Sequence, residues 1–345
     1  MPRTLTEAET RAAVEAFASC GTVAGAARAL GLTRSALRNR LERAQAAGIA
    51  AASPAFDAPE LPDPDPPVEE IIAARLREYE RVHRARRARH LIPVRVRLDG
   101  PVAIAHFGDP HLDDPGCNLP LLMRHMEVVR RTEGMFAANV GDLQNNWVGR
   151  LVRLHAEQTT TARQAWRLVE WFVRELPWLY IVLGNHDCWA GTGDPLDWIL
   201  RTAPGVSGRH GVRLALRFPN GREVRVHARH DFPGHSQWNP AHGPAKAAMM
   251  HWRDHILTCG HRHVSGYQIV KDPATGTISH AIRVASYKDQ DGYAFEKGLP
   301  DGNFGPCAVT VIDPEAESEI GLVTVLWDVE TAADFLTFLR RRRKA

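Results

Sequence analysis

Groups of His, Asp and Asn side chains recur at five places along the 345-residue chain, and they offer ligands for hard metal ions. Carboxylate and amide oxygens mixed with imidazole nitrogens suit Mn, Fe or Zn rather than a sulfur site. About seven ligands that share one carboxylate describe two ions roughly 3.5–4 Å apart, an arrangement used to displace a group from phosphorus. The pattern therefore predicts a binuclear metal hydrolase. The five clusters are Asp109-Pro110-His111, Gly141-Asp142, Gly184-Asn185-His186-Asp187, His230-Asp231 and Gly260-His261-Arg262-His263.

A segment with β-strand character precedes each cluster. Apolar or alternating patterns predict strands at residues 102–107, 137–140, 178–183, 223–229 and 255–258, with a further half-exposed strand at 94–98. Helices are expected between them, at 119–132 and at about 159–175. Open α/β sheets place their ligands just after the carboxyl ends of strands, because the strands hold the converging loops rigid. The sequence thus predicts an α/β domain whose site lies on the strand-end rim.

The first 48 residues predict a small helical unit, with helices near 7–18, 23–30 and 33–47. Thr22 and Thr33 can cap the second and third helices, and Gly31 permits the turn between them. Small Ala27 lets two helices cross closely, as in a helix-turn-helix. A helical bundle used only for assembly would share this apolar pattern. In the DNA-binding interpretation, the third helix presents to DNA the side chains of Arg34, Ser35, Arg38, Asn39 and Arg40.

Residues 49–67 are rich in Pro and acidic side chains, which keep a chain extended, so this stretch is predicted to be a linker. Residues 68–92 predict a basic helix that could be a spacer, a docking helix or a basic stripe. The main domain is expected at 93–330 and a basic helix or tail at 331–345. The arginines of the two basic segments could contact phosphates, with release of counterions, or could form a solvated helix face and a frayed tail.

The composition is that of an ordinary globular protein, 44% hydrophobic and 24% charged, with a net charge of +3. No apolar run approaches the about 18–20 residues that span a bilayer, and the N-terminal residues are too acidic and polar for a secretory signal. We therefore expect a cytoplasmic protein without a membrane partner. Five widely spaced cysteines with no Cys-x-x-Cys pair argue against a disulfide framework and against a cysteine zinc site.

The five motifs, in this order and at these separations, resemble the calcineurin-like metallophosphoesterase family over roughly residues 95–330. The resemblance implies a sandwich of mixed β-sheets flanked by helices. It also implies two divalent metal ions, with Mn expected and Fe or Zn as alternatives. One ion would be held by Asp109, His111 and His263 and the other by Asn185, His230 and His261, with Asp142 bridging both.

The same resemblance implies catalytic roles. A water or hydroxide bridging the two ions would be the nucleophile, because two cations lower its pKa. His186 would protonate the leaving oxygen, and Asp187 could orient the His186 imidazole. Asn145 stands where the family often has Asp or Asn and is expected near the substrate phosphate, although an ordinary turn Asn would look the same.

Strand parity distinguishes His230 from the histidines near it. The even-numbered positions of residues 223–229 should face the core, which leaves His227 on the opposite face and His230 just beyond the strand, as the other ligands are. The family often has Gly where this chain has Asp231. His106, which lies within a strand, is expected to be a structural histidine, as is His227.

Together these features predict a metal-dependent phosphoesterase that hydrolyses phosphodiesters in nucleic acid, with the N-terminal unit bringing it to DNA and raising its local concentration through the linker. One alternative is a phosphomonoesterase or small-nucleotide phosphodiesterase whose N-terminal unit serves assembly. Another is a DNA-binding regulator with a non-catalytic metal domain. The intact ligand set argues against the regulator, since a retired site would be expected to lose Asp142 or His186. From Ser286 onward the sequence shows no chemistry.

Overall fold

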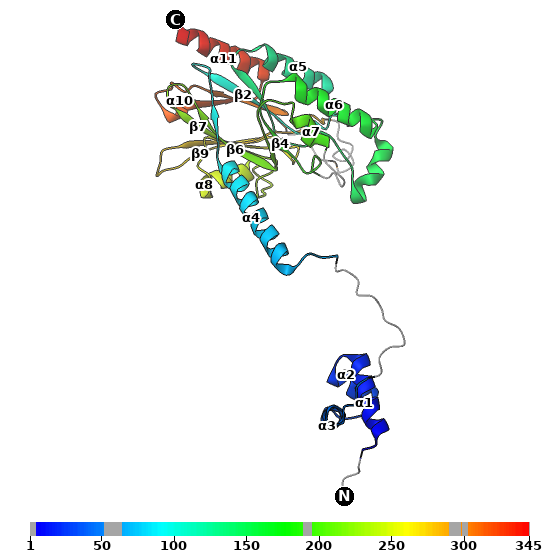
Figure 1. The fold of residues 1–345 in the computed structure, drawn as a ribbon. Helices are drawn as coiled ribbons and strands as arrows, with labels where there is room; N and C mark the ends of the chain where they lie inside the picture. Colours follow the sequence, from blue (N-terminus) through cyan, green and yellow to red (C-terminus); the bar gives the residue numbers. More distant parts are fainter. Residues whose placement is uncertain (1–4, 52–63, 189–194, 290–297, 299–302, 345) are drawn as a thin grey trace. The chain divides into compact units, whose positions relative to one another are not determined.

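A computed structural model describes residues 5–51, 64–188, 195–289, 298 and 303–344. The chain divides into two compact units, Met1–Arg75 and Leu76–Ala345 (Figure 1). Residues 52–63 of the predicted linker lie outside the described residues. Within the described part of the chain, no helix is both long and apolar enough to cross a membrane.

The N-terminal unit contains the three predicted helices, α1 (Glu7–Cys20), α2 (Val23–Ala29) and α3 (Arg34–Ala46). The side chains of Thr6, Thr22 and Thr33 cap their first turns by accepting backbone N–H groups. Small Ala26 and Ala27 lie at the contact between the helices, as predicted, and form the buried apolar core with Ala13 and Leu37. Partly buried apolar side chains such as Leu30 and Leu41 pack against this core.

A long helix, α4 (Val68–His90), follows, and none of its residues is buried. Its last turn contacts the larger unit: Arg89 donates a hydrogen bond to the carbonyl of Ser207 (3.1 Å), and the His90 ring lies 5.8 Å from that of Trp252. The chain then enters the first strand of the sheets, β1 (Ile92–Arg95).

Two six-stranded mixed sheets form the larger unit, which gives it the predicted α/β architecture. The β6 sheet has the strand order β1, β6 (Gly211–Arg217), β7 (Glu223–Arg229), β8 (Ile256–Cys259), β10 (Ile278–Arg283) and β9 (Gly266–Lys271). The β2 sheet has the order β12 (Val323–Leu326), β11 (Cys307–Ile312), β2 (Val102–Phe107), β3 (Met135–Asn139), β4 (Trp178–Leu183) and β5 (Val206–Arg209).

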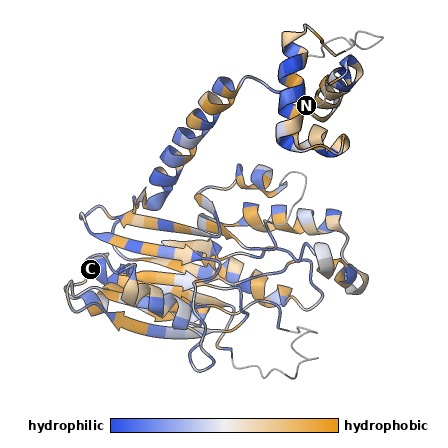
Figure 2. Cartoon of the chain, turned by 90° about the horizontal axis from the view of Figure 1, so that it is seen from below, coloured by the Kyte–Doolittle hydropathy of each residue, from blue (hydrophilic) through white to orange (hydrophobic). Residues whose placement is uncertain are grey.

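The two sheets pack face to face, and helices cover the outer face of the β2 sheet. Alternation along β2 shows the arrangement: Val102 and Ile104 face the β6 sheet, whereas Ala103, Ala105 and Phe107 face the helices. Most strand residues are apolar, as expected for strands buried on both faces (Figure 2). The covering helices are α5 (Leu119–Arg131), α6 (Ala162–Glu175) and α11 (Val329–Lys344).

A smaller helix, α8 (His242–Met250), packs on the outer face of the β6 sheet through Ala247 and Ala248 against Leu257 and Cys259. Short helical segments complete the unit: η1 (Gly149–Glu157), α7 (Pro195–Leu200) and α10 (Glu319–Leu322). The sequence predicted no helix at α8, because its Ala-rich stretch follows a polar loop and lacks a side-chain cap.

The basic C-terminus differs from the solvated, frayed tail that the sequence allowed. Arg340 is 8% exposed, and its guanidinium donates to the carbonyls of Asp99 and Pro101 and to the carboxylate of Glu133. Arg343 pairs with Asp313 at 3.0 Å. These two arginines therefore anchor α11 to the sheet edge, because a planar guanidinium can satisfy several acceptors at once.

Candidate metal centre

The carboxyl ends of five strands carry the predicted ligands. β2, β3 and β4 run parallel in one sheet, and β7 and β8 run parallel in the other. Each predicted ligand cluster begins within three residues of the end of one of these strands, as expected for ligands on the strand-end rim.

Four of the predicted ligands surround one point. Nε2 of His230 lies 2.9 Å from Oδ1 of Asn185, 2.9 Å from Nδ1 of His261 and 3.2 Å from Oδ2 of Asp142. Asp142, His230 and His261 each offer a ligand atom within 4.8 Å of the others. The other ring nitrogen of His230 donates to the carbonyl of Val140 (2.9 Å), so in the neutral ring Nε2 carries a lone pair directed at this point.

The other three predicted ligands form an adjoining group. Nε2 of His263 lies 3.2 Å from Nε2 of His111 and 3.6 Å from Oδ2 of Asp109. The same Asp109 oxygen accepts the backbone N–H of His261 at 2.6 Å, which joins this group to the first one. Asp109 is fully buried and His111 nearly so, whereas His261 and the His263 side chain reach solvent, so the cluster has a buried floor and an open rim.

Asp142, a member of the first group, also contacts the second. Its Oδ1 accepts the backbone N–H of His186 at 3.0 Å, and its carbonyl accepts the backbone N–H of His111 at 3.1 Å. This leaves Oδ2, the oxygen beside His230, directed into the cluster. One carboxylate oxygen is thus free of backbone partners at the position where the sequence places the bridging ligand.

The backbone at the cluster is strained. Among the described residues, positive φ angles occur at six non-glycine positions, and four of these are predicted ligands. Such conformations cost about 1–3 kcal/mol each and persist where the surrounding structure imposes them, which is common at functional sites. The four residues are His111 (φ 42°), Asp142 (φ 50°), His261 (φ 71°) and His263 (φ 52°).

Three motifs have a glycine directly before a predicted ligand, namely Gly141, Gly184 and Gly260. Each glycine lies against a ligand from a different motif, where a side chain would not fit. A Cβ on Gly184 would lie 2.7 Å from the backbone nitrogen of Asp142, and one on Gly260 would lie 2.5 Å from Oδ1 of Asp109. A Cβ on Gly141 would collide with the ring of His230. The motif glycines are therefore needed for the close approach of the strand ends, which is what brings the ligands together.

The buried carboxylates of the cluster favour a bound positive charge. Burial raises the pKa of Asp109 to about 7. Burial lowers the pKa of His230, but its hydrogen bond to Asp142 and the charges of Asp142 and Asp109 raise it overall to about 10. A proton on His230 thus supplies a positive charge beside the buried carboxylates of Asp142 and Asp109. A metal ion bound there would supply positive charge in its place.

Two buried polar atoms support the same interpretation. Oδ1 of Asp109 and Nδ1 of His111 have no hydrogen-bond partner among the described residues. Buried polar atoms are rarely left without partners, and an absent ion is a common reason. Ligand atoms around one ion at about 2.1 Å lie about 3 Å apart, close to the separations seen here. The residues present therefore fit a divalent metal site of imidazole, carboxylate and amide donors.

His186 lies at the side of the cluster. Its Nδ1 donates to the backbone carbonyl of Asn145, so Nε2 is the nitrogen that faces the site, 4.0 Å from Oδ2 of Asp142. The ring lies edge-on to those of His111 (5.1 Å) and Trp147 (5.2 Å). Burial lowers the pKa of His186.

The structure gives Asp187 a different role from the predicted one. Its two carboxylate oxygens accept the backbone N–H groups of Leu143 (2.9 Å) and Gly184 (2.8 Å), and the side chain is fully buried. Asp187 therefore ties the β3 and β4 loops together, and the carbonyl of Asn145 takes the orienting position at His186.

The side chain of Asn145 is buried and pairs with a neighbouring carboxylate. The residue is 1% exposed, its side-chain NH₂ donates to Asp114 (2.9 Å), and its backbone N–H donates to Asp113 (2.7 Å). Asn145 is part of the site wall through its carbonyl group.

Residues 286–288, for which the sequence suggested no chemical role, also contact the site. The carbonyl of Asp109 accepts the Ser286 hydroxyl (2.7 Å) and the Tyr287 N–H (3.1 Å). Lys288 pairs with Asp114 at 3.0 Å, and its ammonium lies 5.8 Å from the Trp147 ring. Nothing local in the sequence marks these residues, since the loop reaches the site only through the pairing of β10 with β8.

Arg283, at the end of β10, links the two histidine loops. This arginine is 1% exposed and donates to the carboxylate of Asp231 (2.8 Å) and to the carbonyls of Gly260 (2.5 Å) and Pro240 (2.8 Å). Asp231 follows His230 and Gly260 precedes His261. The Asp231 carboxylate thus has a buried cationic partner, and Arg283 holds both ligand loops.

His106 and His227, the two strand histidines that the sequence excluded from the site, are structural, as predicted. His106 lies between the hydroxyl groups of Tyr180 (2.7 Å) and Thr310 (2.9 Å) in the core. His227 packs its ring against Phe232 and Trp252 on the outer face of the β6 sheet.

The predicted DNA-contacting residues lie on α3 of the N-terminal unit. Arg34, Ser35, Arg38 and Asn39 are exposed. Arg40 is half-buried and lies 3.8 Å from a carboxylate oxygen of Glu9, so this residue contributes to the bundle.

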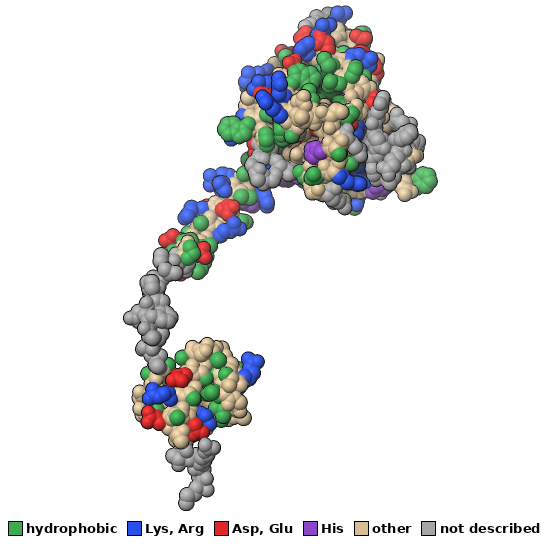
Figure 3. All heavy atoms as spheres, turned by 90° about the vertical axis from the view of Figure 1, so that its right-hand side faces the viewer, with side chains coloured by type: hydrophobic (Ala, Val, Ile, Leu, Met, Phe, Trp, Pro, Cys, Tyr) green, Lys and Arg blue, Asp and Glu red, His purple; other side chains and the backbone are tan. Residues whose placement is uncertain are grey.

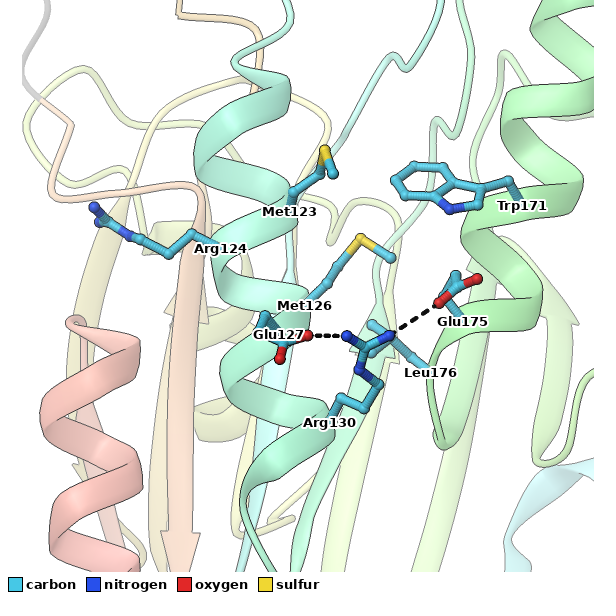
Figure 4. A pocket seen from close by; sticks show the side chains of 8 residues that line it. All are labelled: Met123, Arg124, Met126, Glu127, Arg130, Trp171, Glu175 and Leu176. Carbon is cyan, nitrogen blue, oxygen red and sulfur yellow. Dashed lines mark hydrogen bonds and ion pairs between the residues drawn. The ribbon is translucent and has the colours of Figure 1, made fainter.

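A hollow of about 410 Å³ lies elsewhere, between α5 and α6 (Figure 4). Met126 and Trp171 form its apolar part, and Arg130 pairs with Glu127 and Glu175 across it. No predicted site residue lines this hollow, so it gives no support to the metal centre.

No protein-family model and no curated protein matches the chain. Among solved structures, the chain is similar to the crystal structure of Chaetomium thermophilum Vps29, with 12% sequence identity and a TM-score of 0.31. The match covers 65% of this chain and 91% of that chain. A TM-score this low does not establish a relationship between the two proteins.

Proposed function

We propose that the chain is a metal-dependent phosphoesterase of the calcineurin-like type that hydrolyses phosphodiester bonds in nucleic acid. One observation carries the proposal: seven side chains predicted as ligands, from five separate strand ends, converge into one cluster. Their partition into two adjoining groups, with Asp142 in contact with both, supports two ions rather than one.

Bound divalent cations would supply Lewis-acid stabilisation of the phosphoryl oxygens and an activated water. The chain's own side chains would position these cations. Asp109, His111 and His263 would hold one cation, and Asn185, His230 and His261 the other, with Asp142 shared between them. The buried floor excludes water from below, so the substrate enters from the open side at His261 and His263.

His186 would be the general acid. Because Nδ1 donates to the Asn145 carbonyl, the second proton of the charged ring resides on Nε2, which faces the cluster. That proton can pass to the leaving oxygen of the substrate. The Asn145 carbonyl fixes the ring orientation, the task that the sequence assigned to Asp187.

Trp147 and Lys288 favour a nucleotide substrate over a phosphoprotein. Both belong to the wall next to His186, where the leaving group departs. An aromatic ring can stack on a nucleobase, and a lysine ammonium suits a neighbouring phosphate. Exposed Arg34, Arg38 and Asn39 on α3 support DNA as the polymer, because such side chains contact phosphates and base edges.

The first test measures hydrolysis of duplex DNA, single-stranded DNA, RNA and aryl mono- and diesters, with Mn²⁺ and with chelator. We expect Mn²⁺-dependent cleavage of polynucleotides and of aryl diesters, lost in Asp142→Asn. Absence of metal-dependent hydrolysis of every ester would overturn the phosphoesterase assignment. Turnover of aryl monoesters alone would overturn the assignment to nucleic acid.

The second test concerns His186. His186→Asn should slow DNA cleavage by about 10²–10⁴-fold, because the sugar oxygen needs a proton to leave. A nitrophenyl diester should lose much less, since nitrophenolate leaves without protonation. His235→Asn, an exposed histidine in the loop after His230, is the matched control and should leave both rates unchanged. Equal losses on the two substrates would exclude His186 as the acid.

A further inference from the structure

The surface of α4 carries a stripe of exposed apolar side chains. The stripe residues recur every three or four positions, a spacing that places them on one face of a helix. Each is between 38% and 66% exposed, and no residue of α4 is buried. Green side chains are visible on this helix beside the blue arginines (Figure 3). The stripe consists of Val68, Ile71, Ile72, Leu76, Tyr79 and Val82.

Such a stripe is unusual on a solvated helix. Single exposed apolar residues are common, but a continuous apolar patch marks an interaction site. A helix of this length derives most of its stability from packing of its apolar face. The last turn of α4 contacts Ser207 and Trp252 through Arg89 and His90, and the stripe ends before that turn.

The charges of α4 indicate what covers the stripe. The first two turns carry Glu69 and Glu70 and no basic side chain. After Glu80 the helix has no acidic residue. The basic part that follows consists of Arg81, Arg84, Arg86, Arg87 and Arg89.

We infer that α4 pairs antiparallel with α4 of a second copy of this chain. A twofold axis near the centre of the stripe, between Arg75 and Leu76, places Ile72 of one copy level with Tyr79 of the other. It also places Glu70 level with Arg81 of the second copy, so the acidic end of each helix lies against the basic end of the other. The interface is self-complementary, as twofold symmetry requires. A parallel pair would instead place like charges together.

The other ligand suggested by the arginines is nucleic acid, and the stripe does not suit it. The stripe begins at the acidic end, where Glu69 and Glu70 repel phosphates, and apolar side chains gain nothing from a phosphate backbone. A second copy satisfies both the apolar face and the charge gradient.

The oligomeric state of the full chain tests the inference. After nuclease treatment, sedimentation velocity is measured over an about hundredfold range of concentration, because self-association follows mass action. We expect a species of twice the 38.3 kDa chain mass that dissociates on dilution. A chain that stays monomeric throughout overturns the inference.

Two variants locate the interface. Ile72→Lys together with Leu76→Lys should raise the dimer dissociation constant at least about 100-fold, since two charges enter the centre of the stripe. Both positions are exposed, so folding is retained and can be checked by circular dichroism. Ile320→Lys is the matched control, because Ile320 is 61% exposed, as is Leu76. Dimers that survive the double substitution show an interface elsewhere and overturn the inference.

Charge reversal tests the antiparallel arrangement. Glu69→Arg with Glu70→Arg should weaken the dimer, and so should Arg81→Glu with Arg84→Glu. Mixing the two variants should restore association, because each acidic segment again meets a basic one. If the Glu69 and Glu70 reversals leave the homodimer unchanged, the helices are not antiparallel.

Discussion

Gly184 occupies a position where the fold leaves no room for a side chain. A Cβ there would lie 2.7 Å from the backbone nitrogen of Asp142 and closer still to its carboxylate. An ordinary contact begins at 3.4 Å, so the backbone of Asp142 has to move by about 0.7 Å and its carboxylate by more. A backbone atom cannot rotate out of the way. Gly184→Ala should therefore displace the residue that contacts both groups of ligands.

The displacement predicts a specific pattern of losses. Overpacking of this kind costs about 1–3 kcal/mol of stability, which leaves the protein folded. A shift of about 1 Å at a reacting centre can lower the rate about 100-fold. We expect kcat/KM for an aryl phosphodiester to fall by about that factor and Mn²⁺ affinity, measured by calorimetry, to fall at least about 10-fold.

Gly321→Ala is the control for Gly184→Ala. Its Cβ would meet nothing closer than 3.4 Å, so neither metal affinity nor turnover should change. The Gly184 φ angle is not positive, which means that alanine can adopt the backbone conformation and only the close approach is tested. A folded Gly184→Ala protein with wild-type Mn²⁺ affinity and turnover would refute the argument that this glycine positions Asp142.

Three further predictions concern residues outside the ligand set. Arg283→Lys should weaken Mn²⁺ binding by about 10–100-fold, because one ammonium cannot satisfy Asp231 and two carbonyls together; unchanged affinity would remove Arg283 from the support of the histidine loops. Burial lowers the pKa of His106 to about 3, below its value of about 6.5 in the unfolded chain. Protonation therefore favours the unfolded state. The free energy of unfolding should fall by about 1.4 kcal/mol for each pH unit below about pH 6.5. Denaturant titrations from about pH 7 to about pH 5 should show a shallower dependence in His106→Gln, and an equal slope would contradict the assignment. Arg34→Ala with Arg38→Ala should weaken DNA binding and reduce its salt dependence while leaving turnover of a nitrophenyl diester unchanged; equal DNA retention would contradict a role of α3 in DNA binding.

The strands that carry the ligands were predictable because their patterns are local. Residues 102–107, 178–183 and 223–229 form strands with the predicted bounds, since apolar runs and alternation report burial directly. The expected strand at 94–98 instead covers Ile92–Arg95, because its pairing with β6 sets its extent. Pairing partners of this kind are not visible in one short segment of sequence.

The role of Asp187 shows where adjacency in sequence misleads. Neighbouring His186 and Asp187 predicted a carboxylate that orients an imidazole, but the turn after β4 directs the two side chains apart. The Asp187 carboxylate instead satisfies the backbone N–H groups of Leu143 and Gly184, which would otherwise be buried without partners.

The side chains that gather at the strand ends are predictable from the sequence, because strand period and the placement of His, Asp and Asn after each strand are local properties. Only the tertiary structure decided which groups support them, such as Arg283 from β10 and the Asn145 carbonyl at His186. The physical reason is that a hydrogen-bond partner is selected by distance in space. An arginine at a strand end has the same local pattern whether it faces solvent or two buried carbonyl groups.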